Sequence, residues 1–117
     1  MELDWKRLSQ RIREILEELV AMKSTTCSRA EQEPARYFAD FFAALPYFQE
    51  HPEDMGCLAI PDDPYGRSVP YALLRGKTKD TVVLSGHFDV VSSEEYGAAE
   101  EFAYTLESPE LEERLRA

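Results

Sequence analysis

The chain has 117 residues and a formal net charge of −10, from 23 acidic and 13 basic side chains. Its length fits one domain, and its 44% hydrophobic and 11% aromatic content is typical of a globular protein rather than a disordered one. The negative charge argues against nucleic acid or an anionic membrane surface as a partner, because both would repel it.

Apolar side chains at helical spacing predict two helices in the first half of the chain. The first covers residues 4–23 and has an apolar face opposite a charged one. A loop, KSTTCS, follows it. Ser28 and Glu31 have the spacing of a capping box, and the second helix is predicted over residues 30–45, ending before Pro46. Its aromatic stripe favours a place in the core. The stripe consists of Tyr37, Phe38, Phe41 and Phe42.

From residue 46 the pattern changes to short strands separated by turns. A polar loop, QEHPED, comes first, and we expect its His51 to be a solvated side chain. Three strands are predicted, over residues 57–60, 68–75 and 81–85. Pro70 indicates an edge or a bulge, and residues 76–80 indicate a hairpin. The third strand is apolar on both faces, so we expect it at the centre of the sheet.

The last part of the chain is acidic. Residues 94–117 hold eight acidic and two basic side chains. Ser108 and Pro109 suit the cap and the first position of a helix that begins at about 109. Together the predicted elements favour an α/β fold in which two amino-terminal helices pack on a mixed sheet.

The termini and the cysteines indicate a cytoplasmic protein. The sequence has no apolar run of roughly 20 residues, the length of a membrane span, and no secretory signal is visible at its start. Cys27 and Cys57 form no CxxC pair. We therefore expect both to be reduced, inert thiols.

The stretch TVVLSGHFDVV at residues 81–91 places two ionisable side chains at the end of the third predicted strand. His87 and Asp89 point the same way if the backbone stays extended, and Gly86 allows close approach of a ligand. Imidazole is the commonest metal ligand in proteins, and a nearby carboxylate can fix its tautomer. From the pattern alone, a core histidine satisfied by a local carboxylate remains the alternative.

The sequence SGHFDVV after a strand resembles the first metal motif, GHxDVV, of the zinc aminoacylase/carboxypeptidase/desuccinylase metallopeptidase family. The resemblance extends upstream through the predicted strands and the Glu-rich start of the second helix to the segment VAMKST. The continuation SSEEYG after HFDVV most resembles the arginine-utilization (RocB-like) branch of that family.

The resemblance implies that His87 is a ligand of one zinc in a two-metal site, and that Asp89 is the catalytic carboxylate that orients His87. It also implies a three-layer zinc-peptidase catalytic domain. In that family two metals activate a bridging water to attack an amide or peptide carbonyl, and a glutamate acts as general base. The implied substrate is a small peptide or an N-acyl amino acid.

The 28 residues after Asp89 contain no histidine and no Asp-x-Lys-Gly sequence. Glu94 and Glu95 follow Asp89 too soon to be the family's Glu-Glu pair, so we interpret them as part of a solvated acidic loop. We therefore expect residues 1–117 to be an incomplete amino-terminal portion of a metallohydrolase, inactive in isolation, with oligomerisation left open. The alternative is a non-catalytic acidic binding module that keeps the scaffold without the metal site.

Overall fold

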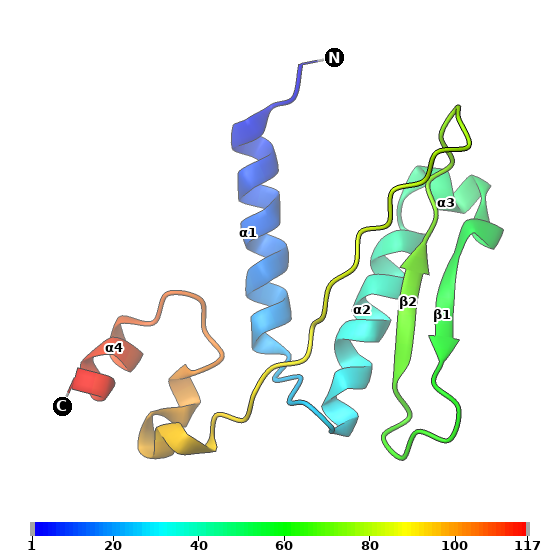
Figure 1. The fold of residues 1–117 in the computed structure, drawn as a ribbon. Helices are drawn as coiled ribbons and strands as arrows, with labels where there is room; N and C mark the ends of the chain where they lie inside the picture. Colours follow the sequence, from blue (N-terminus) through cyan, green and yellow to red (C-terminus); the bar gives the residue numbers. More distant parts are fainter. Residues whose placement is uncertain (1, 117) are drawn as a thin grey trace.

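The computed structural model describes residues 2–116 and has a mixed α/β architecture (Figure 1). Its elements in chain order are α1 (Trp5–Ala21), the 3₁₀ turn η1 (Arg29–Glu31), α2 (Gln32–Ala43), α3 (Pro46–Glu50), the 3₁₀ turn η2 (Pro52–Asp54), β1 (Met55–Ala59), β2 (Ser68–Ala72), the 3₁₀ segment η3 (Glu94–Phe102) and α4 (Pro109–Arg116).

Helix α1 begins where a side chain satisfies its first turn. The Asp4 carboxylate accepts a hydrogen bond from the Arg7 backbone N–H at 3.0 Å, which is the usual role of an N-cap. Arg13 and Glu17 form an ion pair one turn apart at 3.1 Å. The apolar face is only partly covered, with Trp5 68% and Ile12 57% exposed. The periodicity therefore predicts the helix correctly, but not a buried position for it.

The predicted capping box is present at the entry to α2. Ser28 accepts from the Ala30 N–H at 3.2 Å, and Glu31 accepts from the Ser28 N–H at 3.3 Å. One turn of 3₁₀ helix separates this cap from α2. Helix α2 then packs on both strands through its buried Pro34 and Ala35.

A further helix begins at Pro46, where the sequence predicted only the end of the second helix, and the polar loop predicted over residues 49–54 contains the end of α3 and the turn η2. Pro46 lies at the start of α3, a position that tolerates proline because the missing N–H would have no partner there. Phe48 of α3 is buried and packs on Phe42 of α2, with ring centroids 6.0 Å apart. Pro46, which follows α2, thus starts a new helix rather than a loop.

Strands β1 and β2 form a two-stranded antiparallel sheet in which Met55 pairs with Ala72 and Ala59 with Ser68. Pro70 lies opposite Cys57, so proline is tolerated in an edge strand as expected. The first strand begins and ends earlier than the predicted range 57–60, and the second ends three residues before the predicted 75.

The prediction of a central strand at 81–85 was wrong for the described part of the chain. Residues 76–90, here called the extended segment, cross the molecule between α1 and α2 (Figure 1) and form no strand. Val82, Val83 and Leu84 are 84%, 81% and 92% exposed. A strand that is apolar on both faces needs a neighbour on each side, and within residues 2–116 this segment makes no backbone hydrogen bond to β2.

The described residues bury few apolar side chains, namely Ala35, Phe48 and Ala99. The aromatic stripe of α2 is half-buried rather than core. The radius of gyration is 17.5 Å, against roughly 13 Å for a compact domain of this length. Helix α1 and the carboxyl-terminal elements stand apart from the sheet (Figure 1), so the molecule is elongated and open.

The carboxyl-terminal part is more helical than the sequence indicates. Glu94 and Glu95 begin η3 instead of lying in a loop, although their side chains are exposed as expected. Ser108 caps α4 by accepting from the Leu111 N–H at 3.1 Å, and Pro109 is the first residue of that helix. None of the helices within residues 2–116 has the length and apolar character needed to cross a membrane.

Candidate functional site

The segment that links α1 to α2 holds the end of the extended segment in place. Thr25 and Val90 form an isolated parallel bridge. The Val90 N–H donates to the Ser24 carbonyl at 2.9 Å, and the Thr26 N–H donates to the Val90 carbonyl at 2.8 Å. The buried Ser24 hydroxyl donates to the Phe88 carbonyl at 2.5 Å. Residues 88–90 are therefore fixed by three consecutive residues that the sequence predicted as loop.

His87 and Asp89 meet at this anchored end. The Nδ1 atom of His87 lies 3.1 Å from Asp89 Oδ1 and 3.1 Å from the Asp89 carbonyl oxygen. Both oxygens are acceptors, so either contact favours the tautomer with its proton on Nδ1. The His87 side chain is 85% exposed. Its Nε2 lone pair then faces outward, which is the arrangement a metal-binding imidazole needs.

Thr26 completes the hydrogen bonding of Asp89. Its hydroxyl lies 2.8 Å from Asp89 Oδ2, the carboxylate oxygen turned away from His87. This bond is the main reason that the pKa of Asp89 lies below its ordinary value, and the nearby His87 adds a smaller lowering. Asp89 is therefore ionised at neutral pH and can accept the Nδ1 proton of His87.

An apolar cleft of about 490 Å³ adjoins the pair and is bounded by α1, α2, β2 and the extended segment. Leu16, Leu19 and Val20 line it from α1, and Phe38 and Phe42 line it from α2. The Phe38 and Phe88 rings lie 6.0 Å apart, which ties the site to α2.

A smaller hollow of about 190 Å³ is also lined by His87 and Asp89 and includes Arg67 and Glu31. Arg67 is held by Asp63 at 2.6 Å and by Glu31 at 3.4 Å. Its hydrogen bonds keep the pKa of Asp63 below the ordinary value. Two carboxylates already pair with this arginine, so it fixes the 60–67 turn against Glu31 of η1.

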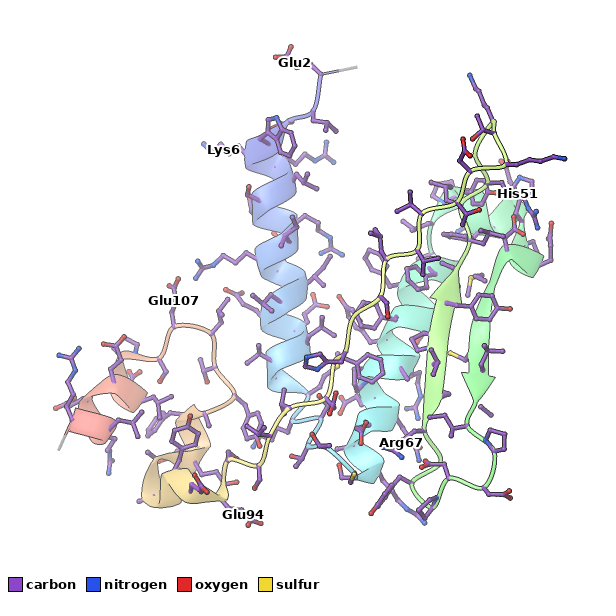
Figure 2. All side chains as sticks on the ribbon, in the orientation of Figure 1. Glu2, Lys6, His51, Arg67, Glu94 and Glu107 are labelled. Carbon is purple, nitrogen blue, oxygen red and sulfur yellow. The ribbon has the colours of Figure 1, made fainter. Side chains whose placement is uncertain are left out.

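The described residues hold one cluster of three ligand-type side chains, His51, Glu53 and Asp54, whose donor atoms lie within 4.8 Å of one another. Arg75 contacts both oxygens of Asp54, at 2.6 and 2.8 Å, and Tyr47 donates to Asp54 at 3.1 Å. The carboxylate is therefore already neutralised by a cation. His51 and Arg67 lie at opposite ends of the α2–sheet region (Figure 2), so this cluster is separate from His87.

Sequence reasoning identified the two residues that meet, His87 and Asp89, but it missed Ser24 and Thr26, which hold them. The available signal was three successive hydroxyl residues directly after a helix, Ser24 to Thr26. Such residues often bond to nearby backbone. Cys27, next to them, is a free thiol on the surface, as is Cys57.

Two curated proteins of Bacillus subtilis (strain 168) are similar to the chain. Protein RocB is 30% identical over 101 residues, which are 85% of this chain and 18% of that protein. The uncharacterized protein YqjN is 42% identical over 84 residues, which are 71% of this chain and 15% of that protein. The chain thus spans less than a fifth of the length of each. No protein-family model matches it, and no solved structure matches it.

Proposed function

We propose that residues 1–117 form part of the catalytic domain of a zinc-dependent metallohydrolase that cleaves amide or peptide bonds, and that His87 is a metal ligand in it. The observation that carries the proposal is the contact between His87 Nδ1 and Asp89 Oδ1 at 3.1 Å, with the imidazole otherwise exposed. A core histidine satisfied by a carboxylate would be buried, and this one is not.

The similarity to RocB supports a relationship to the RocB-like branch. The sequence resembles the arginine-utilization branch of the aminoacylase/carboxypeptidase/desuccinylase metallopeptidases, so we propose a role in arginine or amino-acid utilization. The substrate class that fits the resemblance is a small peptide or an N-acyl amino acid.

The chain's own residues would prepare one ligand. Asp89 would hold the Nδ1 proton of His87, fix the tautomer and raise the basicity of Nε2. When bound, zinc would supply an activated water and polarise the scissile carbonyl. The apolar cleft beside the pair would keep bulk water away from one side of the site.

A complete metal shell needs more than these residues. Zinc sites in proteins normally have three or four protein ligands, and no third His, Cys, Asp or Glu gathers at His87 within the described part of the chain. We therefore propose that the remaining ligands and the general base come from other residues of a longer polypeptide, as the much greater length of both relatives suggests.

The test compares residues 1–117 with the longest polypeptide that carries them. Zinc content and hydrolysis of a panel of N-acyl amino acids and dipeptides are measured for both. We expect the 117-residue chain to bind zinc weakly and to be inactive, because one imidazole cannot hold the metal tightly. In the longer polypeptide, His87→Ala should lose zinc and activity together. Asp89→Asn should keep part of the zinc and lose about 10- to 100-fold in affinity or rate.

His51→Ala is the matched control, because it removes the other histidine of the chain and should leave zinc content and activity unchanged. Full activity of the His87→Ala polypeptide would contradict the ligand assignment. Absence of zinc and of hydrolysis in the longer polypeptide would favour the alternative, a non-catalytic acidic binding module.

A further inference from the structure

We propose that Thr26 is a positioning residue for His87, acting through Asp89. This inference rests on the proposed function, because it concerns how the proposed ligand is prepared. Thr26 and His87 are 61 positions apart in the sequence, and both contact the carboxylate of Asp89. The Thr26 hydroxyl touches one carboxylate oxygen and the His87 ring touches the other. We call these two linked contacts the relay.

The Thr26 hydroxyl has one proton and two acceptors within reach. Asp89 Oδ2 lies at 2.8 Å and the Val90 carbonyl oxygen at 2.9 Å. The Val90 carbonyl already receives the Thr26 backbone N–H at 2.8 Å. Hydrogen bonds to an ionised acceptor are stronger than those between neutral groups, so the proton belongs with the carboxylate.

That bond decides which way the carboxylate faces. A carboxylate on a short side chain can rotate about its last bond, since that torsion is broad. Anchoring Oδ2 on Thr26 leaves Oδ1 turned toward His87 Nδ1. His87 is highly exposed and makes no other hydrogen bond within residues 2–116, so this carboxylate is its main restraint beside the Asp89 carbonyl.

Thr26 is itself held rigidly by backbone contacts. Its N–H is bonded to Val90, and Thr25 and Val90 form the parallel bridge. Ser28 adds a further restraint on the segment, since its hydroxyl donates to the Thr25 carbonyl at 2.6 Å. The relay therefore starts from a residue held by backbone contacts and ends on the exposed imidazole.

The test reads the tautomer of His87 without any metal. The 117-residue chain is prepared with ¹⁵N-labelled histidine and examined by NMR at about pH 8.5, roughly two units above the ordinary histidine pKa. The chain has two histidines, so a His51→Gln chain assigns the signals. We expect the wild-type chain to carry the proton mainly on Nδ1. In Thr26→Val the ratio of the two tautomers should shift about five-fold toward Nε2–H, because the carboxylate loses its anchor.

Two variants separate the hydroxyl from the fold. Thr26→Ser keeps the hydroxyl and should keep the wild-type ratio. Thr25→Val changes a neighbouring threonine whose hydroxyl contacts only the Lys23 carbonyl, and it should also keep the ratio. Valine at 26 retains the branched shape and the backbone N–H, and an unchanged backbone amide spectrum verifies the fold.

A wild-type ratio in Thr26→Val would overturn the proposal, and so would a shifted ratio in Thr26→Ser, because the methyl group would then be responsible. Either result would leave the metal assignment of His87 untouched. Conversely, absence of zinc from the longer polypeptide would refute the proposed function while the tautomer relay could still be observed.

Discussion

The α2–sheet unit (residues 29–75) and the extended segment that follows it differ in how far their polar groups are paired and their apolar side chains are covered. In the unit, α2 covers one face of two paired strands, and polar contacts close both ends. Arg75 binds the buried Asp54 at one end, and Arg67 binds Asp63 and Glu31 at the other. The unit pairs its buried charges with its own residues.

The extended segment contains an apolar run that the structure leaves uncovered. Val82, Val83 and Leu84 are almost fully exposed. Its end, residues 88–90, is held by the loop after α1 and not by the sheet. The comparison shows that a hydrophobic pattern indicates that a segment needs to be buried. Whether it is buried depends on the neighbouring elements that are present. In the longer polypeptide proposed above, other strands would pair with this segment.

The largest difference between the two regions is expected when one side chain in each is truncated to alanine. Phe48→Ala should cost about 3–5 kcal/mol of unfolding free energy, because Phe48 is buried among aromatic rings of the unit. Leu84→Ala, the matched change in the extended segment, should stay within about 0.5 kcal/mol, because that side chain is exposed. Urea unfolding of both variants measures this. Similar costs for the two would show that the extended segment is packed in solution.

A smaller effect is expected from the charged contacts at the ends of the unit. The hydrogen bonds from Arg75 and Tyr47 hold the pKa of Asp54 below its ordinary value, although burial opposes them. A carboxyl group whose folded pKa is lowered stabilises the fold above its unfolded pKa, about 3.9. That contribution is lost as the pH falls through the lower folded value. The unit should therefore lose stability below about pH 4.

Arg75→Gln tests this contact. The variant should be less stable than wild type at pH 7 and should lose less stability between pH 7 and pH 3, because Asp54 then has no cation beside it. Arg13→Gln removes exposed ion pairs with Glu17 and Glu107 and serves as the control, with little expected effect. Identical pH profiles for wild type and Arg75→Gln would refute the role given to this pair.

Local features of the fold could be predicted from the sequence, and distant ones could not. The capping box of Ser28 and Glu31 and the Ser108 cap of α4 depend on residues within three positions, so spacing alone identifies them. The bridge from Thr25 to Val90 joins residues 65 positions apart, and the local hydrophobic periodicity of a sequence cannot indicate such a contact. The strand at 81–85 was mispredicted for the same reason, because its pattern does not say which neighbour is present.

In the candidate site, too, contacts between residues close in the sequence could be predicted and a contact between distant residues could not. His87 and Asp89 are two residues apart, and an extended backbone places both side chains on the same side, so their meeting could be predicted. Thr26 reaches Asp89 only because the loop after α1 folds back onto residue 90. Its role in the relay can be seen only in the three-dimensional structure.

Hydrogen exchange at the amides of Val82, Val83 and Leu84 tests most directly whether the extended segment is unpaired in this chain and pairs with other strands in a longer polypeptide. In the 117-residue chain these amides should exchange as fast as those of an unstructured peptide, because no acceptor is paired with them. In the longest polypeptide that carries the chain they should be protected as strongly as the amides of β1 and β2. Strong protection in the short chain, or fast exchange in the long one, would contradict the account.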